Sequence, residues 1–346
     1  MRFGNSLNGL VAGVAAAAAL AVSVPASADD VADFYKGKTI TYVVSAGPGG
    51  MYGLYGRTLI DHLAKHIPGQ PKMVIQYMPG SGGYKAANYL YNVAPQDGTV
   101  IAMLLKDLPV AQLLEPKGVK FNMADMNWIG NVTDVPNVIT MFHTAPATTL
   151  DGVKEKEVAM GTTGMQDPEM ATNLILLNKF IGTKFKIIPG YRGVNDIDKA
   201  LEAGELHGRG GSLQSWTARK ADWIGDGKVS FLVQVGLEKT PELPASVPLL
   251  TELGTTDEEK EILRFMSVGT RIGRSLFTLQ NVPKDRVAAL RKAFDDTMKD
   301  PEFLADVEKR KIAVNPMSGE KLQKLIEDLV ATPKPMVEKI QAALEG

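Results

Sequence analysis

The hydrophobic pattern at the start of the chain predicts a strand, a glycine loop and a helix, in that order. Thr39–Val44 is a run of β-branched and aromatic residues, which is typical of a buried strand. From Met51 onward apolar residues recur every four positions, as expected for a helix with one buried face. The residues expected on that face are Tyr55, Leu59, Leu63 and Ile67. The glycines and the proline of residues 47–50 separate the two elements and turn the chain.

The same pattern continues along the next part of the chain. Strands are expected at 73–77 and 99–105, with a glycine-rich loop at 79–83 and a helix at 84–93 between them. This β-α-β-α-β order with short connections predicts a parallel sheet with right-handed crossovers. Ligands on such sheets bind beyond the carboxyl ends of the strands. The loops expected at that one edge are 45–50, 79–83 and 106–107.

The middle of the chain carries a second set of strands, loops and helices. Residues 128–142 have the character of strands that leave the first lobe. Further strands are expected at 157–160, 185–188 and 229–235, loops at 161–164, 189–193 and 208–212, and helices at 167–180 and 195–203 capped by Asp167 and Asn195. The order of strand, Gly/Ser/Thr loop and helix thus recurs, although no sequence identity supports a true repeat.

The last part of the chain is expected to return to the first lobe and to end in helices. Residues 265–279 have strand character, and helices are expected to open at Pro283 and Pro301 and after Ser318. A last amphipathic stretch covers 336–344. The pattern predicts an α/β fold with two lobes, each a mixed sheet flanked by helices. The expected boundaries are 29–138 plus 268–346 for lobe I and 139–267 for lobe II.

The N-terminal segment has the pattern of a secretory signal peptide. Arg2 supplies a basic start, residues 10–24 form an apolar run too short to span a bilayer, and residues 25–28 form a small-residue cleavage site. We expect residues 1–28 to be removed by cleavage after Ala28, which predicts a periplasmic protein. A retained membrane anchor is the alternative. The chain has no cysteine, which excludes a lipid-anchored form and fits an exported protein stabilised by its core.

The length and charge of the chain indicate how many lobes it has and which partners are unlikely. Without residues 1–28 about 318 residues remain, which is long for one core and makes two lobes the expectation. Loss of Arg2 leaves 37 Lys and Arg against 39 Asp and Glu, and no basic run is present. This balance argues against nucleic acid as a partner. No later apolar run is long enough to cross a membrane.

One motif loosely matches a dinucleotide-binding fingerprint. Gly47, Gly49 and Gly53 follow a strand, but a dinucleotide site also needs an acidic residue at the end of the next strand to hold the ribose. Residues 76–78 are Gln, Tyr and Met, so that acid is missing. We therefore expect no nucleotide cofactor.

Metal and nucleophile chemistry are also weakly supported. His62 and His66 lie four residues apart on the first helix and could share a metal, but no third ligand is nearby. We expect them to be solvated histidines on the helix face. Ser45, Ser81 and Ser212 sit at loop edges without a histidine obviously placed to activate them. The sequence therefore predicts no catalytic residue and no metal site.

The loops rich in Gly, Ser, Thr and Tyr at the strand ends predict a ligand cleft between the lobes. Backbone N–H groups in such loops and at helix N-termini bind negatively charged or polar ligand atoms. The predicted ligand-binding residues are Ser45, Gly47, Gly49, Gly50, Met51, Tyr52, Ser81 and Asp107 in the first lobe, and Thr162, Thr163, Gly164, Met165, Tyr191, Gly211 and Ser212 in the second.

Several short motifs, in their order and spacing, are similar to those of one known family. They are residues 34–40, the loop 47–50 with Arg57 downstream, and residues 79–83, 95–99, 191–193, 203–205 and 248–254. Over nearly the whole mature chain the sequence resembles the periplasmic solute-binding receptors of tripartite tricarboxylate transporters, the Bug or TctC-like family.

The resemblance implies a two-lobed periplasmic binding protein with a type II-like fold that closes on an organic acid. In this family the lobes hold a carboxylate with backbone N–H groups, hydroxyls and bound waters, without a salt bridge. The resemblance also implies a monomeric receptor, not an enzyme, that delivers its ligand to the membrane permease subunits of a tripartite transporter. Two alternatives stay open. One is a periplasmic enzyme that uses the glycine loops as an oxyanion or phosphate site, and the other is a ligand sensor for signalling.

Two departures from the family pattern concern the ligand. Gly53 stands where many relatives carry an Asp that can pair with a ligand amine, and Tyr52 beside it could stack on a ring or fill a smaller pocket. Asp167 and Glu169 enter the second-lobe helix, where acids compete with a bound anion. Either Asp167 points away as an ordinary cap, or the ligand has only one carboxylate held elsewhere. Three arginines have two possible roles: they lie at the surface, or they supply positive charge to the ligand. They are Arg209, Arg271 and Arg274.

Overall fold

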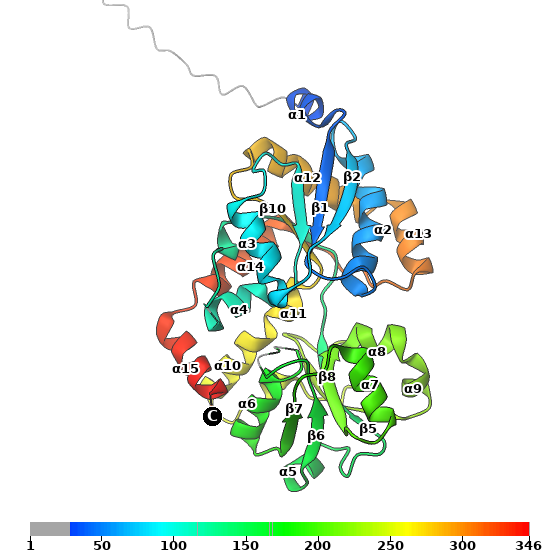
Figure 1. Ribbon diagram of the computed structural model, residues 1–346, viewed down its shortest axis with the longest axis vertical. Helices are drawn as coiled ribbons and strands as arrows, with labels where there is room; N and C mark the ends of the chain where they lie inside the picture. The colour runs from blue at the N-terminus through cyan, green and yellow to red at the C-terminus, as the bar shows by residue number, and fades with distance from the viewer. Residues whose placement is uncertain (1–27, 116, 166, 168, 346) are drawn as a thin grey trace, which may run out of the picture.

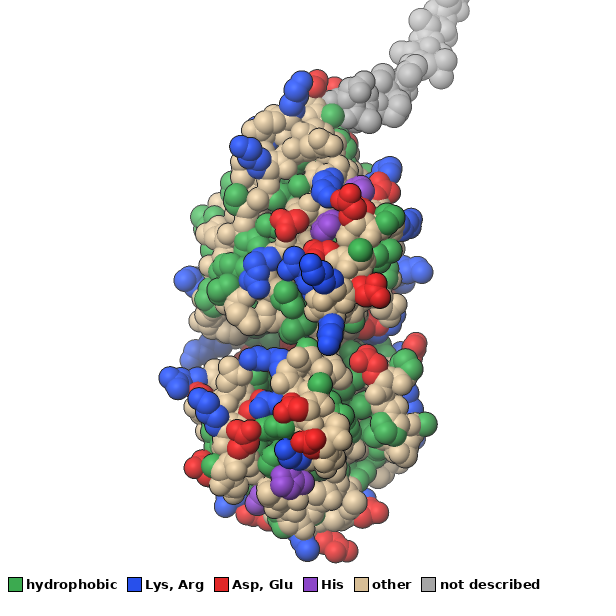
Figure 2. Space-filling model, turned by 90° about the vertical axis from the view of Figure 1, so that its right-hand side faces the viewer, with side chains coloured by type: hydrophobic (Ala, Val, Ile, Leu, Met, Phe, Trp, Pro, Cys, Tyr) green, Lys and Arg blue, Asp and Glu red, His purple; other side chains and the backbone are tan. Residues whose placement is uncertain are grey.

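Two mixed β-sheets form the centres of two lobes, one above the other in Figure 1. The structure, a computed structural model, describes residues 28–115, 117–165, 167 and 169–345. The strand order is β11-β4-β10-β3-β1-β2 in the first sheet and β7-β6-β8-β5-β9 in the second. The predicted α/β fold, with two lobes that are each a mixed sheet flanked by helices, is confirmed. Figure 2 shows the waist where the two lobes meet.

The first sheet is built around a parallel unit, as the sequence predicts. Its strands are β1 (Thr39–Val44), β2 (Lys72–Tyr77), β3 (Val100–Met103), β4 (Asn127–Asn131), β10 (Ser275–Thr278) and β11 (Met317–Ser318). β1 pairs in parallel with both β2 and β3, and β10 inserts antiparallel between β3 and β4. The loops that follow β1, β2 and β3 therefore leave the sheet at the same edge, where ligands bind in sheets of this kind.

Side chains of β1 alternate between two faces of this sheet, because successive residues of a strand point to opposite sides. Tyr42 and Val44 belong to the core on the side of α2 (Met51–His66), and Val43 belongs to the core on the side of α3 (Tyr84–Asn92). The predicted apolar face of α2 is buried, with exposed fractions of 1–2% for Tyr55, Leu59, Leu63 and Ile67.

The second sheet contains a glycine-rich strand where the sequence suggests a loop. Its strands are β5 (Asn137–Phe142), β6 (Val158–Gly161), β7 (Phe185–Ile188), β8 (Gly208–Ser212) and β9 (Val229–Val235). The expected loop 208–212 is wrong, since these residues form β8 between β5 and β6. A Cβ on Gly208 would lie 2.3 Å from the carbonyl oxygen of Thr140, and one on Gly210 would lie 2.5 Å from that of Glu169. Close backbone approach, not a turn, explains these glycines.

The helices at the C-terminal end follow the sequence prediction closely, and the segment before them does not. The remaining helices are α1 (Ala28–Tyr35), α4 (Leu108–Leu114), α5 (Gly152–Glu155), α6 (Thr172–Ile181), α7 (Val194–Glu202), α8 (Leu213–Arg219), α9 (Ala221–Gly225), α10 (Asp257–Ser267), α11 (Gly269–Ile272), α12 (Lys284–Thr297), α13 (Pro301–Lys309), α14 (Gly319–Val330) and α15 (Lys334–Leu344), with short 3₁₀ turns at Ser81–Gly83, Met123–Asp125 and Leu250–Leu253. The strand character expected for 265–279 holds only in β10. The capping box formed by Thr256 and Glu259 starts α10 upstream and carries helix into this region.

Two predicted helix caps are placed differently. α7 begins at Val194 with Gly193 as its N-cap, so Asn195 is not the cap; its Oδ1 instead accepts a hydrogen bond from Arg219 at 2.8 Å. α6 begins at Thr172, later than predicted. The Asp167 carboxylate accepts hydrogen bonds from the N–H groups of Glu169 (2.9 Å) and Met170 (3.0 Å). Asp167 therefore caps the turn before the helix instead of the helix itself.

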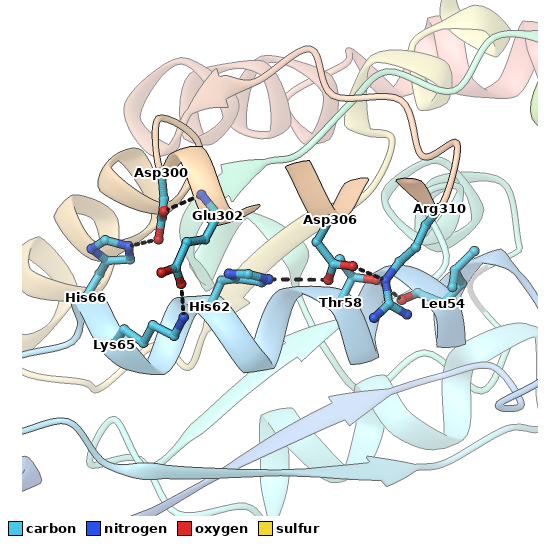
Figure 3. A network of polar contacts seen from close by, with 9 residues as sticks. All are labelled: Leu54, Thr58, His62, Lys65, His66, Asp300, Glu302, Asp306 and Arg310. Carbon is cyan, nitrogen blue, oxygen red and sulfur yellow. Dashed lines mark hydrogen bonds and ion pairs between the residues drawn. The ribbon is translucent and has the colours of Figure 1, made fainter. Parts of the chain in front are cut away.

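The two histidines of α2 face α13, which packs against the helix (Figure 3). His62 is 8% exposed, and its Nε2 lies 3.3 Å from Oδ2 of Asp306. His66 Nε2 lies 2.9 Å from Oδ2 of Asp300, and its side chain is 26% exposed. The expectation of solvated histidines is therefore wrong for His62, whereas His66 is partly exposed. Among the described residues no group of three or more His, Cys, Asp and Glu side chains is placed to hold a metal ion.

The predicted signal peptide, residues 1–28, lies outside the described residues except at Ala28, where α1 begins. Over the part of the chain that the structure describes, none of the helices combines the length and the apolar character needed to span a membrane.

Candidate functional site

A cavity of about 1010 Å³ lies between the lobes, beyond the carboxyl ends of β1 and β3. Residues of both lobes line it, including Tyr52 and Asp107 from the first and Ser212 and Arg219 from the second. The predicted site residues among its lining are Met51, Tyr52, Ser81, Asp107, Thr163, Gly164, Met165 and Ser212. The predicted site residues outside its lining are Ser45, Gly47, Gly49, Gly50, Thr162, Tyr191 and Gly211.

The loop after β1 ends in an open helix N-terminus. Gly50 is the N-cap of α2 in extended conformation, and no side chain caps the first turn. A Cβ on Gly47, Gly49 or Gly50 would meet nothing within 4 Å, so the backbone here faces open space. Ser45 is buried, and its Oγ accepts a hydrogen bond from the N–H of Leu105 at 3.0 Å. Ser45 therefore ties the ends of β1 and β3 together.

Steric contact explains the glycine at position 53. A Cβ there would lie 2.4 Å from the carbonyl oxygen of Pro48, closer than real contacts allow. The same carbonyl oxygen accepts a hydrogen bond from Nη1 of Arg57 at 2.8 Å. The loop thus folds back over the first turn of α2, and a side chain at position 53 has no room here.

The side chain of Tyr52 supports a buried arginine. Its hydroxyl accepts a hydrogen bond from the N–H of Lys106 at 2.9 Å, and the Arg274 guanidinium carbon lies 4.0 Å from the ring centroid. Burial raises the pKa of the Tyr52 hydroxyl, so it stays neutral. Tyr52 lines the cavity, but its ring and its hydroxyl already have protein partners.

Arg274 carries a positive charge at the cavity without a carboxylate at ion-pair distance, and the charges of Asp107 and Glu169 act on it only over a longer distance. The residue is 3% exposed and lines the cavity. Its buried Nε has no hydrogen-bond partner, and no ion pair joins the guanidinium to any residue that the structure describes. The expectation that Arg274 lies on the surface is wrong, because α11 and the start of β10 place it under Tyr52 and Tyr55.

Lys106 joins the two lobes through a buried ion pair. Its Nζ lies 3.0 Å from Oδ2 of Asp107 in the first lobe and 2.6 Å from Oε1 of Glu169 in the second. Burial alone acts to lower the pKa of Lys106, but the two carboxylates outweigh it and hold that pKa above its usual value. For Glu169, burial acts to raise the pKa, but the charge and hydrogen bond of Lys106 together with the charges of Arg274 and Arg209 outweigh it, so the pKa lies below its usual value.

Two further carboxyl groups in the cavity are less well compensated. Burial raises the pKa of Asp107 in spite of Lys106, and burial also raises the pKa of Asp167. Asp167 lines the cavity and accepts a hydrogen bond from the hydroxyl of Thr163 in addition to its two backbone donors. Asp167 is thus both a cap and a wall of the cleft, so it does not point away from the site.

The remaining predicted residues of the second lobe serve its internal structure. The Thr162 hydroxyl donates to the carbonyl oxygen of Gly164 at 3.1 Å, and Tyr191 packs against the core of the lobe. Gly211 lies in β8 with a φ of 137°, and a Cβ there would lie 3.0 Å from Nη1 of Arg209. These residues shape the loops behind the cavity.

The two other arginines left open by the sequence have partners away from the cavity. Arg209 is fully buried, and its Nε donates to Oδ1 of Asp198 at 2.7 Å while its guanidinium lies 3.7 Å from the Trp216 ring centroid. Burial lowers its pKa. Arg271 pairs with Asp134. The surface expectation is therefore wrong for Arg209.

Sequence reasoning missed an apolar side of the cavity, which we name the helical wall. It consists of Leu108, Ala111 and Leu114 of α4, Ile175 of α6, Met266 of α10 and Leu344 of α15. In Figure 1, α15 lies beside α10 and α6 at the left of the waist, and contacts join it to α4 and α6. No helix at 108–114 was expected from the sequence, although Asp107 followed by Pro109 is typical of a helix start.

Several solved structures share this fold at low sequence identity. The periplasmic binding protein BugD is 20% identical, with 89% of this chain and 98% of that chain covered and a TM-score of 0.65. MatC from Rhodopseudomonas palustris with bound malate is 17% identical over 89% and 99% of the two chains, with a TM-score of 0.62. Another R. palustris protein, with adipate, is 18% identical over 89% and 97%, with a TM-score of 0.64. Among curated proteins no sequence matches the chain.

The family assignment comes from the sequence match over most of the chain. The model of the tripartite tricarboxylate transporter family receptor, TctC, matches residues 56–342. That span covers both sheets except β1, together with the helices that line the cavity from α4 to α15. The chain therefore belongs to the TctC family of tripartite tricarboxylate transporter receptors.

Proposed function

We propose that the protein is an extracytoplasmic solute receptor that binds a small organic carboxylate between its lobes and delivers it to a membrane transporter. The observation that carries the proposal is the cavity between the lobes, with a buried and unpaired Arg274 in its wall. Membership of a receptor family and the carboxylates named with two solved relatives, malate and adipate, support it.

Closure of the lobes on the ligand is the mechanism we infer. We assign residues 29–138 and 268–346 to one moving lobe and residues 139–267 to the other. The polar contacts that cross between the lobes include the Lys106–Glu169 ion pair and a 3.1 Å hydrogen bond from Gln214 to the Tyr55 hydroxyl. Further contacts join α15 to the second lobe, from Lys179 to the carbonyl oxygen of Ala342 and between Lys339 and Glu258. A ligand that touches both lobes binds the closed arrangement more tightly and shifts the population toward it.

Cellular placement follows from the same assignment. We infer that residues 1–28 are a signal peptide cut after Ala28, that the mature protein works in the periplasm as a monomer, and that its partners are the permease subunits of a tripartite transporter. The basic start, the apolar run and the small-residue cleavage site of the N-terminal segment support export. BugD, a solved structure with this fold, is named as a periplasmic binding protein.

Ligand-dependent stabilisation tests the proposed function. Mature protein is screened by thermal unfolding and titration calorimetry against monocarboxylates and dicarboxylates. A ligand at about 100 times its Kd is expected to add about 2.7 kcal/mol to the free energy of unfolding, because it binds only the folded state. A broad carboxylate screen without stabilisation, together with turnover of any substrate, contradicts the receptor assignment.

A further inference from the structure

We propose that this cleft is built for a monocarboxylate with an apolar body, whose carboxylate pairs with Arg274 and whose body lies against the helical wall. The inference rests on the proposed function, since it names the chemical class of the receptor's ligand. Three features of the cavity carry it: one buried arginine without an ion pair, an excess of carboxyl groups in the lining, and an apolar side formed by four helices.

The first feature is the state of the Arg274 charge. Buried cations in folded proteins are normally paired, because removing a charge from water is costly without a partner. Lys106 follows this rule with two carboxylates at ion-pair distance, whereas Arg274 has none at that distance. Its guanidinium carbon lies 4.0 and 5.6 Å from the ring centroids of Tyr52 and Tyr55, and the charges of Asp107 and Glu169 act on it over a longer distance. Its Nε has no hydrogen-bond partner. A planar guanidinium in this position matches a carboxylate in bidentate geometry.

The second feature limits the ligand to one carboxylate. The described lining contains five carboxyl side chains, Asp107, Glu115, Asp167, Glu169 and Glu345, against the two arginines Arg219 and Arg274. Lys106 is already engaged by two of these acids. Arg219, the other cation of the lining, is exposed to solvent and donates a hydrogen bond to Asn195 at 2.8 Å. A second anionic group away from Arg274 therefore meets mainly carboxyl groups, which is unfavourable.

The third feature is the helical wall together with Met165. Met165 is 48% exposed, one of the few large apolar side chains of the described residues left open to this degree, and it lines the cavity from the second lobe. Leu108, Leu114 and Ile175 line it from α4 and α6. Covering these apolar atoms with a ligand removes them from water, which stabilises the complex in proportion to the area covered. A volume of about 1010 Å³ leaves room for a body well beyond a carboxylate alone.

A matched ligand series tests the proposal on the unmodified mature protein. Titration calorimetry compares hexanoate with acetate, which lacks the apolar body, and with adipate, which adds a second carboxylate. Hexanoate is expected to bind at least tenfold more tightly than each of the other two. Adipate or acetate binding as tightly as hexanoate overturns the ligand class and leaves the receptor function standing. If neither these three nor the wider carboxylate screen binds, the proposed function itself fails.

Variants test the two ends of the site separately. Arg274→Met is expected to weaken hexanoate binding at least tenfold, and Arg274→Lys less, because a point charge replaces the bidentate fork. Arg271→Met is the matched control: Arg271 is close in sequence, pairs with Asp134 and does not line the cavity, so its hexanoate affinity is expected to stay within twofold. Ala111→Phe fills the helical wall and is expected to weaken hexanoate but not acetate.

Unchanged hexanoate affinity in Arg274→Met overturns the anchor. Equal losses for hexanoate and acetate in Ala111→Phe overturn the placement of the apolar body. Circular dichroism and thermal unfolding establish that each variant is folded, and the ligand series on the unmodified protein decides the ligand class independently of all variants.

Discussion

Arg209 and Arg274 are both buried and both lie over an aromatic ring, but only Arg209 has a carboxylate partner. The Arg209 guanidinium lies 3.7 Å from the Trp216 ring centroid, and its Nε donates to Asp198 at 2.7 Å. The Arg274 guanidinium lies 4.0 Å from the Tyr52 ring centroid and has no ion pair among the described residues. Arg209 belongs to β8 of the second sheet and does not line the cavity, whereas Arg274 lines the cavity between the lobes.

The difference separates a structural cation from a binding cation. A buried charge whose counterion lies inside the fold contributes to stability only as part of a pair, and removing one member leaves the other uncompensated. A buried charge without a counterion costs stability and gains its partner when a ligand arrives. Burial and aromatic stacking alone therefore do not identify a binding residue; the missing counterion does.

The largest expected effect is on the free energy of unfolding when Arg209, the structural cation, is replaced. Arg209→Met leaves Asp198 buried without its main partner and is expected to lower the free energy of unfolding by about 3–5 kcal/mol. Urea unfolding followed by circular dichroism measures it. Arg274→Met, assayed in parallel, is expected to lose less than about 1 kcal/mol, since no ion pair is broken. Equal losses in the two variants contradict the distinction between the two arginines.

The next effect concerns Glu169, the acid that pairs with Lys106 across the two lobes and also lines the cavity. Glu169→Gln keeps the shape of the side chain but removes its charge, so Lys106 retains only Asp107. We expect a loss of about 1.5–3 kcal/mol for the closed arrangement, the range for a hydrogen bond to a charged group. Ligand affinity should fall about tenfold or more, since 1.4 kcal/mol corresponds to a factor of ten.

Small-angle scattering with and without ligand provides the readout for Glu169→Gln. The ligand-free variant is expected to have a larger radius of gyration than the native protein. Lys154→Met is a matched control, because it breaks an exposed ion pair with Asp151 within the second lobe. An unchanged radius and affinity in Glu169→Gln indicate that the ion pair does not contribute to closure.

A smaller effect is expected from changes at Tyr52, whose ring packs against the Arg274 guanidinium. Tyr52→Phe keeps the ring but removes the hydroxyl that accepts the Lys106 N–H at 2.9 Å. A loss of about 1–2 kcal/mol in unfolding free energy is expected, with ligand affinity nearly unchanged. Tyr52→Ala removes the ring as well and is expected to weaken ligand binding clearly. If both variants bind the ligand with the native Kd, the ring has no part in holding Arg274.

The smallest effect on stability is expected for Asp306 in the contact between α2 and α13 (Figure 3), because its carboxylate stays partly exposed to water. Hydrogen bonds from Arg310 and His62 hold the pKa of Asp306 below its usual value. A depressed folded pKa stabilises the protein above the pKa of the unfolded chain, about 3.9, and that contribution is lost as pH falls through the folded value. Asp306→Asn should therefore destabilise slightly at pH 6 and lose this effect toward pH 3. An effect of the same size at both pH values contradicts the assignment to this carboxylate.

Local pattern was enough to predict much of the fold. Thr39–Val44, Phe185–Ile188 and Val229–Val235 are strands at the predicted positions, and the helices after Pro283, at Pro301 and after Ser318 begin where the sequence places them. These elements depend on side-chain period, prolines and caps within a few residues, which the sequence displays directly. The glycine-rich strand β8 was missed. Its glycines are needed because backbone atoms from distant parts of the sequence pack closely against them.

The site divides in the same way. The sequence by itself determined the two lobes, the loops at the carboxyl edge of the first sheet, the family, and eight of the residues that line the cavity. Only the tertiary structure decided that Lys106 meets Glu169 across the lobes, that Arg209 finds Asp198 while Arg274 finds no counterion, and that four helices form an apolar wall. The physical reason is that periodicity and turn chemistry are local, whereas burial and the pairing of charges depend on residues that the fold brings together from far along the chain.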